Sequence, residues 1–163
     1  MKSLGLWLIG FALGVAVNVV AAQKPLAAPA ELRMDPQQIL AAVAQRMNVT
    51  LREDVPVPVI HLESRTPLAQ FQKAIATQWR FKPPVISNAY VVATNEVYLI
   101  DDADYYRRVK RSMEDSLAHE FAHYLQALYL DADLKDDFCE TEAIDVQTAF
   151  RSEFPALALD RAS

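Results

Sequence analysis

Two segments in the first half of the chain repeat their hydrophobic residues with helical spacing. In residues 36–47, PQQILAAVAQRM, apolar side chains recur every three or four positions, which predicts a helix with one buried face. Asp35 followed by Pro36 is a typical helix start, because aspartate caps the first turn and proline fits its first position. Residues 67–81, PLAQFQKAIATQWRF, show the same spacing after Thr66 and predict a second helix.

Two further segments have the composition of strands. Residues 55–59 alternate valine with proline, and because proline cannot donate a ladder hydrogen bond, they predict an edge strand at most. Residues 89–100, AYVVATNEVYLI, are rich in β-branched and aromatic residues. Thr94-Asn95 in their middle predicts a turn that folds this segment into a hairpin.

The second half of the chain predicts two helices joined by a polar break. Acidic residues within 101–104 suit the positive end of a helix dipole, and they begin a long helix that we expect to reach Tyr129. Residues 130–137, LDADLKDD, are mostly polar, and a last helix follows over 137–154, ending at Pro155. Together with the hairpin, these helices predict an α+β fold, with a small antiparallel sheet packed on a helical core.

The first 22 residues have a different pattern. Lys2 is their only charge, and an apolar run from Leu4 ends in small residues, which is typical of a secretory signal cleaved near Ala22-Gln23. An uncleaved membrane anchor is the alternative interpretation, because the apolar run is long for such a signal. Cleavage would make the protein exported, either periplasmic or secreted.

The remaining chain predicts one domain of ordinary globular composition. Residues 23–34 are rich in proline and alanine and predict a flexible tether, residues 35–155 the domain, and residues 156–163 a C-terminal tail. The formal net charge of −5 argues against nucleic acid and anionic membranes as partners, because both require a positive surface. A membrane is expected only if the N-terminal segment is retained. Cys139 is the only cysteine, which excludes an internal disulfide, and we expect it to be buried.

The stretch HEFAH, residues 119–123, carries the candidate chemistry. Residues four apart stack on one face of a helix, so His119 and His123 would point the same way and could bind one metal ion. Glu120 would project beside them as the general base that activates a water molecule. This is the HExxH arrangement of zinc peptidases, with Zn²⁺ as cofactor. The third histidine of the chain, His61, lies in the proline-rich segment and is interpreted as a structural residue.

A catalytic zinc ion needs a third protein ligand in addition to two histidines. The last helix offers carboxylates at Glu140, Glu142 and Asp145. The short polar break allows this helix to fold back antiparallel onto the HEFAH helix, which would bring its first turns opposite the histidines.

Residues 89–150 resemble the gluzincin-type zincins, a superfamily of zinc metallopeptidases. The resemblance consists of the strand NEVYLI (95–100), the HEFAH helix and the glutamate-bearing helix. In many of these families an alanine follows the ligand glutamate by three residues, and Glu140 with Ala143 fits this pattern. Glu142, directly before Ala143, is the alternative third ligand. Gln126, one turn past His123, and Asp145 are candidates for supporting hydrogen bonds to the ligands.

The resemblance implies an exported zinc metallopeptidase whose Glu120 activates the water that cleaves a peptide or protein substrate. It also implies that a strand edge, here NEVYLI, pairs with the extended substrate. A tyrosine is expected to stabilise the transition state. The candidates are Tyr90, Tyr98, Tyr105, Tyr106 and Tyr124. The alternatives are a zincin-like binding or structural protein of the cell envelope without catalytic activity, and a membrane-tethered structural protein.

Overall fold

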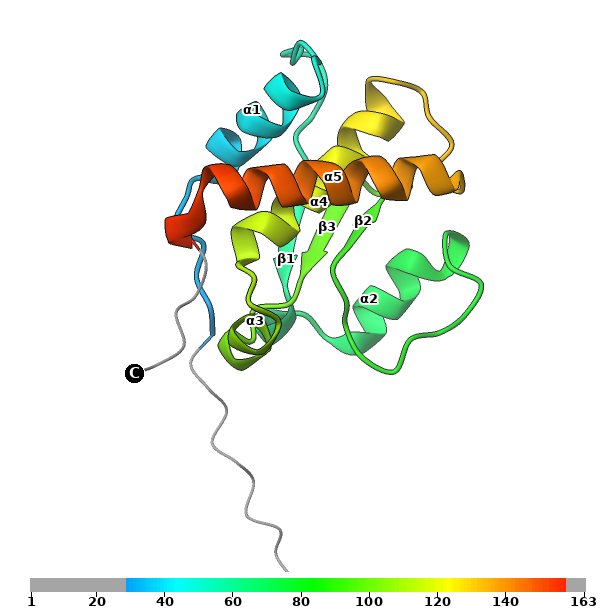
Figure 1. Ribbon diagram of the computed structural model, residues 1–163. Coiled ribbons are helices and arrows are strands. Elements are labelled where there is room, and N and C mark those ends of the chain that lie inside the picture. The colour runs from blue at the N-terminus through cyan, green and yellow to red at the C-terminus, as the bar shows by residue number, and fades with distance from the viewer. Residues whose placement is uncertain (1–28, 158–163) are drawn as a thin grey trace, which may run out of the picture.

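The computed structural model describes residues 29–157 (Figure 1). The expected export signal, its cleavage site and residues 23–28 of the expected tether lie outside this range, as do residues 158–163. In chain order, the elements are α1 (Pro36–Arg46), β1 (Val59–Leu62), η1 (Glu63–Arg65), α2 (Leu68–Ala74), η2 (Ile75–Thr77), β2 (Ala89–Val91), β3 (Glu96–Leu99), α3 (Ala103–Val109), α4 (Met113–Leu128), α5 (Asp137–Glu153) and η3 (Pro155–Leu157). Within residues 29–157, no helix has both the length and the apolar content needed to cross a membrane.

The predicted α+β fold is confirmed, with helices packed on both faces of a three-stranded sheet. The strand order is β1-β3-β2, so β3 is central. The predicted hairpin joins β2 and β3 in antiparallel register, and Asn95 forms its turn with a positive φ of 51°. The sheet is mixed rather than purely antiparallel, because β1 pairs with β3 in parallel.

The two faces of the sheet contact different helices. Val97 and Leu99 of β3 belong to the larger core cluster, which they share with α4, α1 and α5. Tyr98, between them, belongs to a smaller cluster with Phe71 and Ile75 from α2 and η2. This alternation follows from the pleat, which points successive side chains to opposite faces. In Figure 1, α5 runs across α4.

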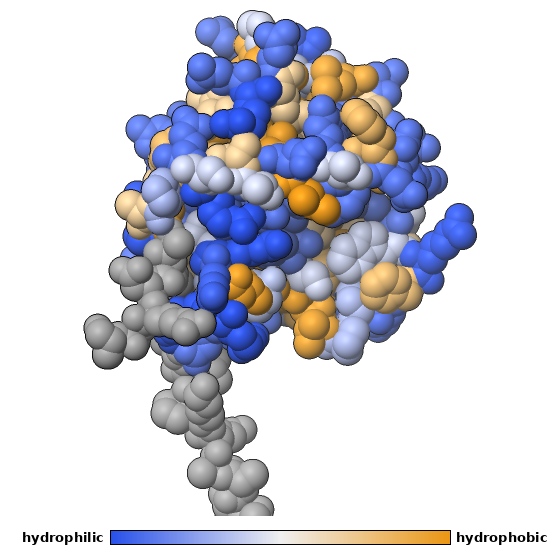
Figure 2. Space-filling view, in the orientation of Figure 1, coloured by the Kyte–Doolittle hydropathy of each residue, from blue (hydrophilic) through white to orange (hydrophobic). Residues whose placement is uncertain are grey.

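The surface seen from the α5 side is consistent with a core that is buried between these layers. Hydrophobic residues on this face form separate patches among hydrophilic ones (Figure 2).

The helix start at Asp35 and Pro36 is as predicted, and the Asp35 side chain accepts a hydrogen bond from the Gln37 backbone N–H. The last helix also matches its prediction, since α5 spans Asp137–Glu153.

The long helix predicted over 101–129 is wrong, because the chain forms two helices there. α3 ends at Val109, and the next residue, its C-cap Lys110, adopts the left-handed conformation with φ 56°. α4 then begins with a capping box at Ser112 and Asp115, whose side chains each accept a hydrogen bond from the other's backbone N–H. These two bonds satisfy donors that a new helix would otherwise leave free, and they stabilise the break.

The second predicted helix is shorter than its hydrophobic spacing indicated. α2 ends at Ala74, and a 3₁₀ turn over residues 75–77 follows. This turn positions Gln78, whose side-chain amide donates to the Tyr90 carbonyl (2.8 Å) and accepts from the Val92 N–H (3.1 Å). The chain therefore leaves helical geometry where it makes contact with β2.

Residues 29–34, the described part of the expected tether, pack against the domain. The Ala30 N–H donates to the Asp101 carbonyl at 2.6 Å, and the Arg33 N–H donates to Glu114 at 2.6 Å. Leu32 and Met34 pack against the larger core cluster. These contacts hold residues 30–34, at the end of the expected tether, against the domain.

Candidate metal centre

Helix α4 places His119 and His123 on one face, as the HEFAH spacing predicts. Their Nε2 atoms lie 3.1 Å apart, and the rings meet edge to face with centroids 4.7 Å apart. α4 is fixed by its capping box, by the sheet and by α5, since most of its side chains are buried. The pair is consequently held on a rigid element.

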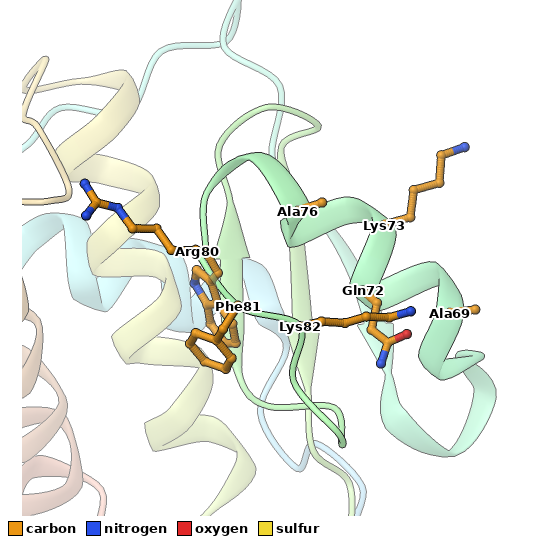
Figure 3. A pocket seen from close by; sticks show the side chains of 8 residues that line it. Ala69, Gln72, Lys73, Ala76, Arg80, Phe81 and Lys82 are labelled. Carbon is orange, nitrogen blue, oxygen red and sulfur yellow. The ribbon is translucent and has the colours of Figure 1, made fainter.

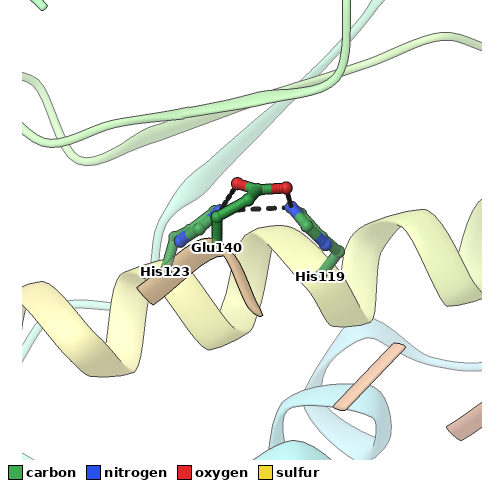
Figure 4. Close-up of side chains that lie close together, drawn as sticks. All are labelled: His119, His123 and Glu140. Atoms are coloured by element: carbon green, nitrogen blue, oxygen red, sulfur yellow. Dashed lines mark hydrogen bonds and ion pairs between the residues drawn. The ribbon is translucent and has the colours of Figure 1, made fainter. Parts of the chain in front are cut away.

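Helix α5 brings the carboxylate of Glu140 onto this pair (Figure 4). One oxygen of Glu140 lies 3.5 Å from His119 Nε2 and the other lies 3.3 Å from His123 Nε2. Ala143, one turn further along α5, is 0% exposed at the contact between the helices. A side chain this small lets α5 approach α4 closely enough for Glu140 to reach the histidines.

Of the three acidic residues considered for the third ligand position, only Glu140 faces the histidines. Its ligand atoms and those of the two histidines all lie within 4.8 Å of one another. Glu142 instead accepts a hydrogen bond from Gln126 at 2.9 Å. Asp145 is exposed on α5 and makes no hydrogen bond or ion pair within the described part of the chain, so its expected supporting role finds no contact here.

The spacing of the possible ligand atoms is close to the spacing around a tetrahedral metal ion. Two atoms that each lie about 2.1 Å from a tetrahedral zinc ion are about 3.4 Å apart. The two histidine Nε2 atoms are 3.1 Å apart, one oxygen of Glu140 lies 3.5 Å from His119 Nε2, and its other oxygen lies 3.3 Å from His123 Nε2. Two neutral imidazoles and one carboxylate also form a common ligand set for catalytic zinc. The residues present therefore fit the metal that the motif implies.

Gln126 orients His123, as its position one turn along the helix indicated. The Gln126 Oε1 lies 2.9 Å from His123 Nδ1, and as an acceptor it places the imidazole proton on Nδ1. The lone pair of Nε2 then faces Glu140. The Gln126 amide is 1% exposed, and it donates to the Cys139 carbonyl and to Glu142, both at 2.9 Å. A chain of hydrogen bonds thus runs from His123 to the start of α5.

His119 lacks an equivalent partner. Its buried Nδ1 makes no hydrogen bond within the described residues, although the backbone of Ala143 lies close enough to raise its pKa slightly. Burial, and then the neighbouring His123, lower the pKa of His119 to about 4, whereas Glu140 acts in the opposite direction. His119 is accordingly a neutral imidazole, the form that binds a metal ion.

Glu120 is buried beside the histidines, as the motif requires of a base. Burial raises the pKa of Glu120 to about 8, a backbone hydrogen bond from Tyr90 lowers it, and the nearby Glu140 raises it further. Glu120 lines both hollows that open at the metal cluster. Its carboxyl group can therefore meet a molecule bound there.

Two hollows of about 690 and 260 Å³ adjoin at this cluster, and together they are called the cleft. Both are lined by Asn88, His119, Glu120 and Glu140. The larger hollow extends along α5 and α3, and the smaller one extends past β2 toward the end of η2. The cluster thus lies where the two hollows adjoin.

Two of the five candidate tyrosines line the hollows at the cluster, Tyr90 the smaller one and Tyr105 the larger one. Of the five, Tyr105 is the one left as the candidate for a transition-state donor. The hydroxyl groups of the other four donate elsewhere. Their acceptors are the Asn95 side chain for Tyr90, the Glu96 side chain for Tyr98, the Ile100 carbonyl for Tyr106 and the Pro56 carbonyl for Tyr124.

The expectation that NEVYLI provides a free strand edge is wrong. It forms the central strand β3, whose two sides are paired with β1 and β2. The edge that faces the cleft belongs to β2, and Gln78 occupies part of it through its bonds to Tyr90 and Val92. No local signal in the sequence indicates this role of Gln78, because both partners lie more than ten positions away.

The two remaining expectations concern His61 and Cys139. His61 lies on β1, where it contacts Glu96 at 3.2 Å and is not part of the metal cluster. Cys139 is buried at the start of α5, as expected.

No family model, curated protein or solved structure matches this chain. The class of protein that fold and site define is an α+β domain with a candidate metal centre of two histidines and one glutamate.

Proposed function

We propose that the protein is an exported zinc-dependent metallopeptidase. His119, His123 and Glu140 hold Zn²⁺, and Glu120 is the general base for hydrolysis of a peptide bond. One observation carries the proposal. The ligand atoms of the three residues converge within 4.8 Å at a cleft that the buried Glu120 also lines.

The chemistry divides between the metal and this chain's residues. When bound, Zn²⁺ polarises the substrate carbonyl and lowers the pKa of water toward neutrality. Glu120 takes a proton from the attacking water as its oxygen bonds to the carbonyl carbon. It then delivers this proton to the amide nitrogen as the C–N bond breaks, which leaves a carboxylic acid and an amine. The new carboxylic acid loses its remaining proton to solvent at neutral pH. Tyr105 is the candidate donor to the developing oxyanion.

The edge of β2 is the surface that would align a peptide substrate. An extended chain that adds to a sheet edge gains main-chain hydrogen bonds, and β2 lies along the same hollow as His119 and Glu120. The side chain of Gln78 imitates such a chain, because its one amide donates to Tyr90 of β2 and accepts from Val92, the residue directly after β2. A substrate that pairs beyond Tyr90 therefore displaces Gln78.

Export rests on residues 1–22, whose apolar run and small terminal residues fit a cleaved signal. N-terminal sequencing of the protein recovered outside the cytoplasm tests this part. A chain beginning at Gln23 supports export with cleavage. A chain that retains Lys2 and stays with membranes contradicts it.

The hydrolase is tested by comparing the wild type with Glu120→Gln, using metal analysis and a peptide library. Glu120→Gln keeps the shape of the side chain and touches no ligand atom, so one zinc per chain is expected in both proteins. Hydrolysis should fall about 10²- to 10⁴-fold in the variant, the contribution typical of a general base.

Two outcomes contradict the hydrolase. Equal cleavage by wild type and variant would attribute the activity to a contaminant. Bound zinc without any cleavage by either protein would instead favour the binding protein that shares this scaffold.

A further inference from the structure

A second pocket lies beside the metal cleft, on the outer face of α2 (Figure 3). It has a volume of about 450 Å³ and is bounded by α2 and by residues 79–82, the sequence WRFK. The Gln72 amide donates to the Pro83 carbonyl at 2.8 Å and holds this segment against α2. The pocket is therefore formed by two elements that are tied together.

The charged residues around this pocket are all cations. Lys73, Arg80 and Lys82 line it, and no acidic residue does. Lys73 and Lys82 extend on the α2 side in Figure 3, and Arg80 extends on the opposite side. Within residues 29–157, no ion pair joins any of the three to an acid. The whole chain has a net charge of −5, so the charge around this pocket is opposite in sign to the charge of the protein.

Two aromatic rings form one wall of the pocket. Trp79 and Phe81 are stacked with centroids 5.4 Å apart and planes 22° apart, and Phe81 is 64% exposed. Trp79 also packs edge to face on the buried Phe71 at 5.8 Å, which fixes the position of the stack. The exposed aromatic surface can cover the aliphatic part of a ligand while the cations meet its charge.

Trp79 connects this pocket to the candidate metal centre. It lines the cationic pocket and also the smaller hollow that contains His119, Glu120 and His123. Gln78, the preceding residue, bonds to the edge of β2 in the same hollow. A peptide that lies along β2 therefore reaches the cationic pocket within a few residues of the cluster.

We infer that the cationic pocket selects substrates with acidic side chains on one side of the cleaved bond. The statement about the cleaved bond rests on the proposed function. The binding of acidic peptides to the pocket does not require that function. Glutamate and aspartate would pair with Lys73, Arg80 and Lys82, and each exposed pair contributes a factor of up to about fivefold. Three such pairs acting together give a preference that is large enough to measure.

Trp79 provides a direct readout of binding, because the chain has only one other tryptophan, Trp7. The probes are two hexapeptides with acetylated N-termini and amidated C-termini. They differ only at three positions, which are all glutamate in the acidic probe and all glutamine in the neutral probe. The full chain with Trp7→Phe is titrated with each probe. The acidic probe should change the Trp79 fluorescence and bind at least tenfold more tightly, and added salt should reduce this difference.

Two matched variants locate the effect. Arg80→Glu with Lys82→Glu should lower affinity for the acidic probe at least tenfold. Arg65→Glu with Lys110→Glu carries the same change of net charge at two exposed cations that line none of the three hollows, and it should change affinity less than twofold. Equal binding of both probes, or an equal loss in both variants, would overturn the inference.

Zinc analysis and peptide cleavage on the same samples keep the two proposals apart. Preference for the acidic probe without zinc or cleavage would retain the cationic pocket and reject the hydrolase. Zinc and cleavage without this preference would retain the hydrolase and reject the pocket as a specificity site.

Discussion

The protein brings histidine and glutamate together in two places, with different consequences. On α4 and α5, His119 and His123 meet Glu140 at 3.5 and 3.3 Å. On the sheet, His61 of β1 meets Glu96 of β3 at 3.2 Å. Residue types and distances alone would rank the two clusters as similar.

In the sheet cluster, both carboxylate oxygens of Glu96 are already engaged. One oxygen of Glu96 contacts His61, and the other accepts hydrogen bonds from Thr94 at 2.7 Å and Tyr98 at 3.1 Å. The His61 ring stacks on Tyr98 with centroids 4.9 Å apart. These contacts join two strands and a turn, so the cluster stabilises the sheet.

In the helical cluster, three basic atoms converge and their other contacts point away from the centre. His123 uses Nδ1 for Gln126 and keeps Nε2 for the cluster. Glu140 is 58% exposed at the cleft and its two oxygens face the two histidines. The two clusters differ because a metal site requires lone pairs that converge on one point and that accept no hydrogen bonds from neighbouring groups.

The largest effect expected from this difference concerns zinc binding itself. His123→Ala removes one of three ligands and should abolish stoichiometric zinc binding, whereas His61→Ala should retain one zinc per chain. Metal analysis of both variants beside the wild type measures this. Loss of zinc in His61→Ala alone would place the metal on the sheet and reverse the comparison.

The next largest effect separates the two glutamates near the start of α5. Glu140→Gln should weaken zinc binding by more than the 10- to 100-fold that loss of a supporting partner costs. Glu142→Gln should lie within that range, because Glu142 contacts Gln126 rather than a histidine. Competition with a chelator of known affinity measures both. A stronger loss in Glu142→Gln would exchange the two roles.

The support of His123 is expected to have an intermediate effect. Gln126→Ala removes the acceptor for His123 Nδ1 and should weaken zinc binding about 10- to 100-fold. Asp145→Asn is the control, because Asp145 is exposed and makes no hydrogen bond or ion pair within residues 29–157. If both variants bind zinc as the wild type does, Gln126 does not orient the ligand.

The features that sequence predicted well depend on local spacing. The shared face of His119 and His123 follows from helix geometry alone. The end of α5 follows from Pro155, which disfavours helical geometry in the residue before it. The break between α3 and α4 was missed because its left-handed residue, Lys110, is not a glycine or asparagine. Ser112 and Asp115 were the available signal, since a serine followed three residues later by an acid forms a capping box.

Features that depend on distant contacts had no comparable signal. The central position of β3 follows from its parallel pairing with β1, more than thirty residues earlier. Gln78 and Trp79 reach the cleft only because α2 ends at Ala74. Which of Glu140 and Glu142 faces the histidines depends on the rotation of α5 about its own axis where it packs on α4. Sequence spacing limited the candidates to these two glutamates but did not decide between them.

The smallest effect tests the structural role of the sheet cluster. Burial alone would raise the pKa of Glu96, but hydrogen bonds from Thr94, Tyr98 and His61, with the charge on His61, outweigh it and lower the pKa below 4.5. A lowered pKa in the folded protein stabilises the fold above pH 4.5, and this contribution is lost as the pH falls through the folded value.

Glu96→Gln should therefore reduce the free energy of unfolding by about 1 kcal/mol at pH 7, the size expected for partly exposed hydrogen bonds. The difference from wild type should shrink as the pH falls below 4.5, because the wild-type carboxylate becomes protonated. Urea unfolding at several pH values measures it, and zinc content should stay unchanged. If the difference in the free energy of unfolding does not change with pH, Glu96 stabilises the fold through packing and its negative charge makes no contribution.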